Sequence, residues 1–197
     1  MVRKMTDDRE PGWLDTIRTR VEHCRSADPD PSVNGAHRTA AVLVLLSGND
    51  DGPTIVLTER AATLTNYPGT LVFPGGSTET GDDGPVATAL RESAEEIGID
   101  PTHVHIIGAL PPLWLSATRF LVTPVVGWCT RLQLTDFLNP DEVAVVIQIP
   151  LREFAKTSGR VQRNGTTDRG GHRYSFEGTA VGDMTSTVID ALLDQYR

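Results

Sequence analysis

Hydrophobic and polar positions alternate along the chain with two different periods. Near each end, apolar residues recur every three or four positions, in 12–24 (GWLDTIRTRVEHC) and in 184–196 (MTSTVIDALLDQY). This spacing puts them on one side of a helix, so both segments are predicted to be amphipathic helices that cover a core. Between the first helix and the remaining chain, 26–35 (SADPDPSVNG) is predicted to be a linker because its prolines and its Asn-Gly pair interrupt regular structure.

Short runs rich in β-branched residues fill most of the chain between these helices. Two of them, 40–47 (AAVLVLLS) and 54–60 (TIVLTER), flank the turn cluster GNDDGP and predict a β-hairpin. We expect further strands at 70–76 (TLVFPGG, closed by a Pro-Gly-Gly loop), 104–110, 120–129 and 142–151, a helical turn at 151–155, and a hairpin or long loop at 159–178. This irregular mixture of strands and helices favours an α+β fold, an α/β/α sandwich around a mixed sheet.

Composition narrows the class of protein. The 197 residues fit one domain, and we place its start after the linker, with 1–35 as tail, helix and linker and 36–197 as the domain. A net charge of −8 argues against nucleic acid or an anionic membrane as a partner. Cys24 and Cys129 show no disulfide or metal spacing, and no signal peptide or membrane span is visible, so we expect a soluble, cytoplasmic protein.

The segment 84–99 (GPVATALRESAEEIGI) contains an unfavourable arrangement of charge. If it is a helix that ends at Gly98, then Glu92, Glu95 and Glu96 gather on one side, opposite the apolar residues. Like charges at these spacings destabilise a helix by about 0.2–0.5 kcal/mol per pair, and acids are also disfavoured at a helix C-terminus. The helix is therefore predicted to be strained unless a cation lies on it.

The loop before this helix supports a metal site. Adjacent Gly75 and Gly76 allow a sharp turn and a close approach of the backbone to a ligand. Asp82 or Asp83 could cap the helix. Three carboxylates beside such a turn offer hard oxygen ligands for Mg²⁺ or Mn²⁺, which in turn bind phosphate groups of a substrate and activate water.

The same segment resembles the Nudix box, G-x5-E-x7-R-E-U-x-E-E-x-G-U with U aliphatic. Residues 91–99 (RESAEEIGI) match its second half, with Ser93 at a U position as the one departure. The first half departs more, because either Asp82 or Asp83 stands for the first glutamate. The resemblance implies a Nudix fold over about 36–195 and metal-dependent hydrolysis of a nucleoside diphosphate linked to another moiety.

The resemblance also implies roles for individual residues. Glu92, Glu95 and Glu96 would be metal ligands, and Glu92 or another acid would polarise the attacking water. Arg91 would hold the glutamates in place, and a carbonyl of Gly75 or Gly76 could complete the coordination. The acid Glu142 lies in a region from which relatives supply a further carboxylate near the metals.

A second stretch, 56–76 (VLTERAATLTNYPGTLVFPGG), is similar to the segment upstream of the box in Nudix coenzyme A pyrophosphatases. Arg60, Phe73 and Gly75 match that signature, so the resemblance implies that they contact substrate. Two features depart from it: Thr65 stands where the signature has a second arginine, and 181–186 reads VGDMTS where that group tends to read I-W-G-x-T-A. A threonine cannot replace a bidentate phosphate clamp, so the substrate specificity could have shifted.

Other polar and aromatic residues carry less information. Trp114 is expected on a loop where a base could stack, and core packing is an equal alternative. Arg119 could contact phosphate or be a surface arginine, and His37, His103, His105 and His172 show no ligand spacing.

Coenzyme A or a derivative is the predicted substrate. ADP-ribose, NADH or another nucleotide diphosphate is the alternative, and a module that binds nucleotides without cleaving them is a third. The retention of all three box glutamates favours the enzyme. The oligomeric state, including a homodimer, is left open.

Overall fold

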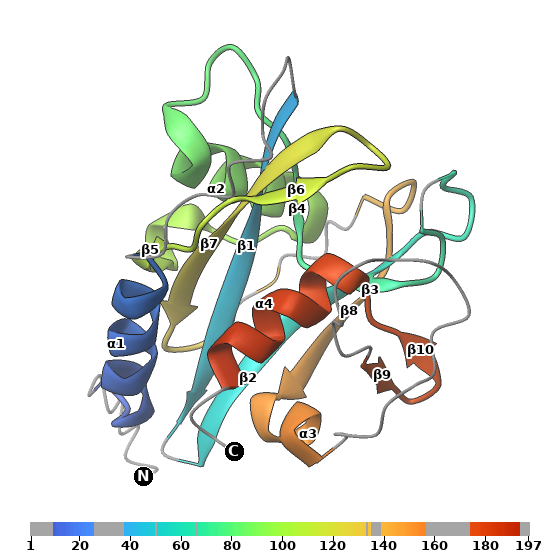
Figure 1. Cartoon of the computed structure of the whole chain (residues 1–197). Coiled ribbons are helices and arrows are strands. Elements are labelled where there is room, and N and C mark those ends of the chain that lie inside the picture. The colour runs from blue at the N-terminus through green and yellow to red at the C-terminus, as the bar shows by residue number, and fades with distance from the viewer. Residues whose placement is uncertain are drawn as a thin grey trace, which may run out of the picture.

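The computed structural model describes residues 10–25, 38–49, 51–65, 67–132, 134, 139–156 and 174–193 (Figure 1). Its helices are α1 (Trp13–Arg25), α2 (Gly84–Ile97), α3 (Leu151–Lys156) and α4 (Asp183–Leu193), with a 3₁₀ turn η1 (Pro101–His103). Its strands are β1 (Arg38–Asn49), β2 (Gly52–Arg60), β3 (Leu71–Val72), β4 (Gly75–Ser77), β5 (His105–Ala109), β6 (Leu113–Leu115), β7 (Phe120–Cys129), β8 (Val143–Pro150), β9 (Ser175–Phe176) and β10 (Thr179–Ala180). The helices and strands predicted from periodicity are confirmed, with the local differences given below.

Strand β1 is the centre of an eight-stranded mixed sheet. It runs parallel to β7 over its length, and its last residues form the predicted antiparallel hairpin with β2. At its beginning β1 pairs on the same side with β4 instead, so β1 changes partner along its length. Strand β8 adds to the other side of β2, and β5 and β6 pair with β7. The long β1–β7 pair therefore supports the hairpin at one end and β4 at the other.

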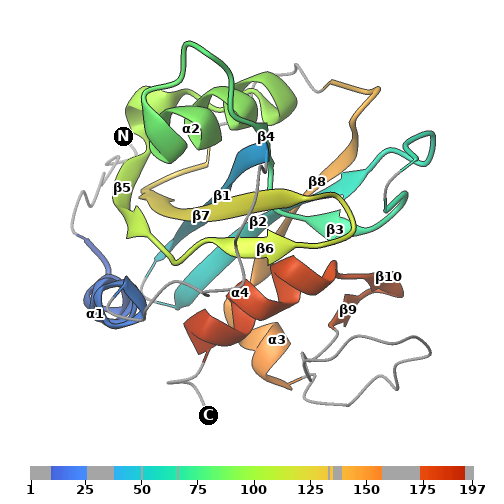
Figure 2. The same cartoon turned by 45° about the horizontal axis from the view of Figure 1, so that its top comes forward.

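Helices cover both faces of this sheet, which confirms the predicted sandwich. Alternate residues of β1 point to opposite faces: Val42 and Val44 lie in a core shared with α1 and α4, whereas Leu43 and Leu45 lie in a second core under α2. Figure 2 shows α2 on one side of the sheet and α3 and α4 on the other. The chain thus has apolar cores on both sides of one sheet.

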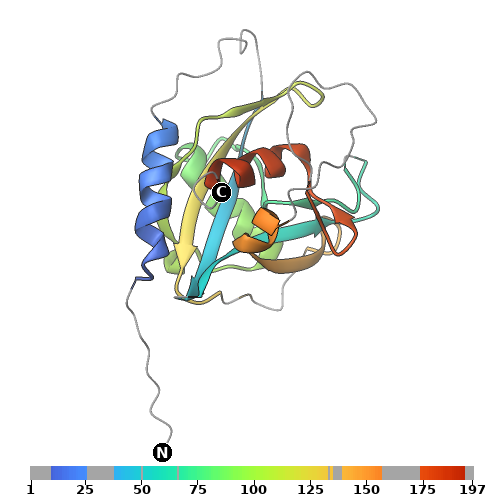
Figure 3. The ribbon, with the colours of Figure 1, turned by 60° about the horizontal axis from the view of Figure 1, so that its bottom comes forward.

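The N-terminal helix is part of the first core. Leu14, Ile17 and Val21 are at most 1% exposed, and the Arg20 guanidinium donates a hydrogen bond from Nε to the carbonyl of Ala191 at the end of α4 (2.7 Å). Figure 3 shows α1 alongside the sheet. Helix α1 therefore covers the core of the domain, and the predicted boundary at residue 35 lies outside the described residues.

Three local predictions differ from the structure. Residues 75–77 were expected in a loop but form β4, because their backbone pairs with Ala40–Val42 of β1. Trp114 was expected on a loop but lies in β6, paired with Leu121 of β7. Of the predicted hairpin or loop at 159–178, the structure describes the short β9–β10 pair and the adjoining residues from Tyr174.

None of the helices in the described part of the chain is long and apolar enough to span a membrane.

Candidate active site

The two adjacent glycines form the floor of an acidic site. Gly75 has φ +148°, and a Cβ there would lie 2.3 Å from the carbonyl oxygen of Ala41 on β1. A Cβ on Gly76 would lie 2.6 Å from the carboxyl carbon of Glu92. Neither space accommodates a side chain. The glycines thus let the backbone of β4 lie directly between β1 and the carboxylate of Glu92 on α2.

Helix α2 exposes its three glutamates to different degrees. Gly98 ends the helix in the left-handed conformation (φ 64°), as expected. The three glutamates do not share an exposed face, however: the Glu95 side chain is 60% exposed and that of Glu92 15%, whereas Glu96 is only 7% exposed. The reason is that Glu96 faces β4, where the Gly75 N–H donates a hydrogen bond to its Oε2 (2.9 Å). The acids lie along the edge of the helix–sheet interface.

Burial perturbs the two inner carboxyls. Desolvation raises the pKa of Glu96 to about 8, against the Gly75 hydrogen bond that lowers it, and the charges of Glu142 and Glu92 raise it further. Desolvation also raises the pKa of Glu92, against its neighbour Arg91, and the charges of Glu95 and Glu142 add to the increase. The protein therefore holds buried acids whose ionised forms lack sufficient positive partners.

Arg91 organises this edge through several acceptors. Its Nε and Nη2 donate to the two carboxylate oxygens of Asp82 (both 3.0 Å), and Nη2 also donates to the Ser77 carbonyl (2.9 Å). The same guanidinium lies 3.1 Å from Glu92 Oε1 and 3.2 Å from Glu95 Oε2. Arg91 thus fixes the loop before α2 and contacts two of the predicted metal ligands.

Asp82 is the partner of Arg91, which distinguishes it from Asp83. Its side chain is 6% exposed and also accepts hydrogen bonds from the Glu79 N–H and the Thr88 hydroxyl (both 2.9 Å). The hydrogen bonds from Arg91, first of all, hold the pKa of Asp82 well below its usual value. Asp83 is the residue before α2 and makes no side-chain cap. Of the two acids that could stand for the first glutamate of the box, Asp82 is therefore the one that contacts Arg91.

A fourth carboxylate and a second arginine approach from β2 and β8. The N–H of Asn139 donates to the Glu96 carbonyl at the end of α2 (3.3 Å), and the following turn leads to Glu142, whose carbonyl accepts from the Ala61 N–H (2.9 Å). The Glu142 charge raises the pKa values of Glu92 and Glu96, whereas the Arg60 charge lowers that of Glu96. Glu142 and Arg60 therefore belong to the acidic site.

Turn hydrogen bonds hold Arg60 in place at the end of β2. Its N–H donates to the Thr70 carbonyl and its carbonyl accepts from the Gly69 N–H (both 3.0 Å). The segment after β2 therefore folds back, so that Gly69 and Thr70 lie beside Arg60. Gly69 has φ +62°, which suits the glycine found there. Thr65 is exposed and lies within this returning segment.

The donor set suits a hard divalent cation. Within the described ranges, no three Asp, Glu, His or Cys side chains already surround one point as metal ligands do. Nevertheless, Glu92, Glu96 and Glu142 supply oxygen donors whose mutual repulsion a cation would relieve, and Glu95 adds a fourth that now contacts Arg91. Glu92, Glu95, Glu96 and Glu142 are thus the residues able to hold such an ion.

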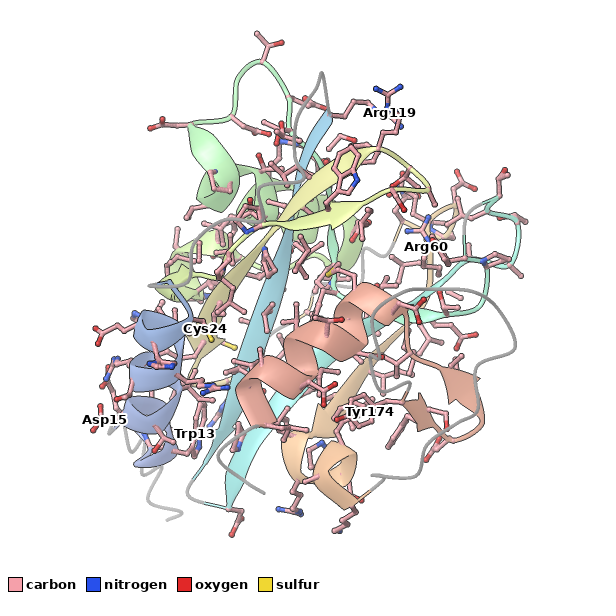
Figure 4. The ribbon with its side chains drawn as sticks, in the orientation of Figure 1. Trp13, Asp15, Cys24, Arg60, Arg119 and Tyr174 are labelled. Carbon is pink, nitrogen blue, oxygen red and sulfur yellow. The ribbon has the colours of Figure 1, made fainter. Side chains whose placement is uncertain are left out.

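The remaining predicted site residues lie in different surroundings. Phe73 is 2% exposed and packs in the core cluster that includes residues of α1 and α4. Trp114 is half-buried in β6. Arg119 lies at the β6–β7 turn, with φ 56°, and Figure 4 shows it and Arg60 at separate positions around the upper right of the fold.

The histidines take no part in the acidic site where they can be described. His103 is exposed next to Asp100, and His105 stacks on Trp128 with ring centroids 5.4 Å apart. His37 and His172 lie outside the described residues.

Sequence reasoning missed the support that Thr88 and Asn139 give to this site. Thr88 is fully buried and donates to Asp82, and its place four residues after Gly84 in the helix offers no sequence signal for that contact. Asn139 contacts α2 through its backbone N–H, which any residue except proline could supply.

A mixed sheet between helices, with a glycine strand and an acidic helix at one end, defines an α/β/α sandwich that carries a cluster of carboxylates suited to a divalent cation. The family model described as the NUDIX domain matches residues 36–168 of this chain. The uncharacterized Nudix hydrolase NudL of Cronobacter sakazakii is 40% identical over 189 residues, which are 94% of this chain and 95% of the relative. NudL of Citrobacter koseri is 43% identical over 187 residues, 91% of this chain and 92% of the relative.

The chain therefore belongs to the Nudix family and is an enzyme of the Nudix hydrolase type. Among solved structures, the NUDIX domain of Shewanella oneidensis NrtR complexed with ADP ribose has a TM-score of 0.57 at 14% identity, covering 86% of this chain and 95% of that chain. A NUDIX hydrolase from Alicyclobacillus acidocaldarius has a TM-score of 0.53 at 18% identity, covering 82% of this chain and 93% of that chain. These two likenesses confirm the fold.

Proposed function

We propose that this protein hydrolyses the diphosphate linkage of coenzyme A or a close derivative, with Mg²⁺ or Mn²⁺ as cofactor. The observation that carries the proposal is the placement of Arg60 beside the acidic site: the N–H of the adjoining Ala61 donates to the Glu142 carbonyl (2.9 Å), and the turn before Glu142 donates from Asn139 N–H to the Glu96 carbonyl (3.3 Å). Arg60 belongs to the segment 56–76 that resembles the coenzyme A pyrophosphatases, and that segment ends with Gly75 and Gly76. Family membership supports a divalent metal, and the four carboxylates support its place.

The chemistry follows from the charges at the site. A diphosphate carries negative charge that must be neutralised before water can attack phosphorus, and a bound divalent cation supplies that neutralisation and lowers the pKa of bound water. Glu92, Glu95, Glu96 and Glu142 would hold the ion. Arg91 and Asp82 keep the loop and the helix in register, and Arg60 orients the substrate phosphates.

In the reaction itself, the oxygen of water forms a bond to one phosphorus, and the bridging oxygen leaves with the other phosphate. A carboxylate of the site accepts the proton from water. Glu92 and Glu142 are the candidates for this base, because each borders the other acids and neither is as deeply buried as Glu96.

The experiment that tests this function is a hydrolysis panel with purified protein. Coenzyme A, ADP-ribose, NADH and dinucleoside polyphosphates would each be incubated with Mg²⁺ or Mn²⁺, with Glu96→Gln as the inactive control. Preferred release of a phosphopantetheine product from coenzyme A supports the proposal. A preference for another diphosphate would keep the chemistry and reject coenzyme A, and no turnover of any substrate would favour a nucleotide-binding module.

Thr65 gives a sharper test of the coenzyme A assignment. Replacing it with arginine restores the signature at an exposed position, so it is not expected to disturb packing. We expect Thr65→Arg to lower KM for coenzyme A relative to ADP-ribose, because a guanidinium can bind phosphate with two hydrogen bonds. Thr65→Ser is the matched control.

A further inference from the structure

A hollow of about 430 Å³ lies at the end of the sheet away from the acidic site. It is lined by residues of the β1–β2 turn, the end of β7, the end of β8 and the start of α3. In Figure 1 and Figure 3 the β1–β2 turn projects at the bottom of the fold. Because β4 pairs with Ala40–Val42 while the hollow begins at Ser47, the two sites are separated by about 15 Å or more along β1. The hollow, which we call the distal hollow, is therefore separate from the catalytic site.

Two hydroxyl groups at the floor of the distal hollow form hydrogen bonds with neighbouring protein atoms. The Thr54 hydroxyl donates to the Ser47 carbonyl (3.1 Å), and the two hydroxyls of Thr54 and Ser47 lie 2.7 Å apart. The Ser47 hydroxyl is also 3.4 Å from Oε1 of Gln148. Ser47, Thr54 and Gln148 therefore line one side of the distal hollow with polar side-chain atoms.

Two arginines line the same hollow. Arg131 follows β7 and is exposed. Arg152, at the start of α3, is 60% exposed and donates from Nη1 to the carbonyl of Asp51 (3.1 Å), which ties its guanidinium to the β1–β2 turn. Acids lie nearby as well, because Asp51 also lines the hollow and Glu153 Oε1 lies 3.8 Å from Arg152 Nε. Leu132 and Pro150 add apolar surface to the lining of the hollow.

We propose that the distal hollow binds a small phosphate-bearing molecule. Two arginines from separate segments, Arg131 and Arg152, line the hollow, and a guanidinium group binds a phosphate with two charge-assisted hydrogen bonds. The volume exceeds what inorganic phosphate needs and lies in the range of small-molecule sites, so an organic phosphate fits, with its apolar part against Leu132 and Pro150.

Titration of the isotope-labelled full chain, followed by amide NMR in the presence of EDTA, tests this proposal. The probes are inorganic phosphate, adenosine monophosphate and acetate. We expect saturable shifts at Gly48, Thr54 and Gln148 with both phosphates, and weaker ones with acetate. Shifts confined to the region of Gly75 and Glu92, or no saturation with any phosphate, would overturn the site.

Variants connect the shifts to the arginines. The pair Arg131→Gln and Arg152→Gln should weaken phosphate binding by about tenfold or more, because two charge-assisted hydrogen bonds are lost. Arg18→Gln, at another exposed arginine on α1, is the matched control and should bind as the parent does. Equal binding by the double variant would refute the proposal.

A second variant keeps the test decisive if the double variant folds poorly. Gln148→Glu puts a carboxylate among the donors and should also abolish the shifts. Neither arginine belongs to the acidic site, so hydrolysis by the double variant should match the parent. This result separates the distal hollow from the proposed catalytic function.

Discussion

Replacing Glu96 with glutamine should stabilise the metal-free protein while destroying its activity. Burial raises the pKa of Glu96 from an ordinary 4.5 to about 8 in the folded protein. Above pH 4.5 the unfolded chain releases this proton and the folded chain retains it, so the contribution of Glu96 to stability falls as the pH rises. The loss proceeds through the window between pH 4.5 and 8 and is complete above 8.

The size of the effect follows from the same two pKa values. Each pH unit in the window lowers the free energy of unfolding by up to about 1.4 kcal/mol, and the whole window by at most about 4–5 kcal/mol. Glutamine keeps a carbonyl oxygen to accept from the Gly75 N–H, so that hydrogen bond survives. Glu96→Gln should therefore remove most of the pH dependence and be more stable than the parent at pH 8.

Urea unfolding in EDTA at several values from pH 5 to 8 measures this difference. Glu95→Gln is the matched control, because Glu95 is 60% exposed and lies on the same helix. Added Mn²⁺ should stabilise the parent and have much less effect on Glu96→Gln. Equal pH slopes for the parent and Glu96→Gln would refute the argument from burial.

Three further substitutions test other contacts of the site. Asp82→Asn removes the charge that Arg91 contacts through two hydrogen bonds, so kcat should fall by about tenfold or more in steady-state assays while KM changes little. Gly76→Ala places a methyl group on the carboxylate of Glu92, so hydrolysis should fall by about a hundredfold, and circular dichroism should show an intact fold. Ser93→Ala removes a fully buried hydroxyl without a hydrogen-bond partner, and urea unfolding should show a gain of about 1 kcal/mol; a loss would mean that the hydroxyl has a partner.

The sequence predicted the elements well because their hydrophobic periods were clear. The hairpin of β1 and β2 has a strong turn cluster between two apolar runs, and α2 ends at a glycine. The Nudix box placed Arg91 and the glutamates on one helix. These features depend on neighbouring residues, so local patterns reveal them.

Other features depended on contacts between distant segments. Periodicity could not show that β4 takes a place beside β1, because a run of two glycines and a serine has no hydrophobic pattern. The burial of Glu96 also depends on a distant segment. A helical wheel shows on which side of α2 Glu96 lies, but it does not show that β4 packs against that side. Phe73 matched a substrate-binding signature, yet its aromatic ring fills the core.

Because β1 changes partner along its length, the acidic site and the segment that carries Thr65 depend on different strands. At its beginning β1 holds β4, which is locked to α2 and to the buried acids, whereas the segment after β2 that carries Thr65 projects from a different strand. Insertions or exchanges in that projecting segment leave the pairing of β4 untouched. Under the proposed function, such an arrangement lets substitutions at Thr65 alter substrate preference without moving the elements that hold the carboxylates.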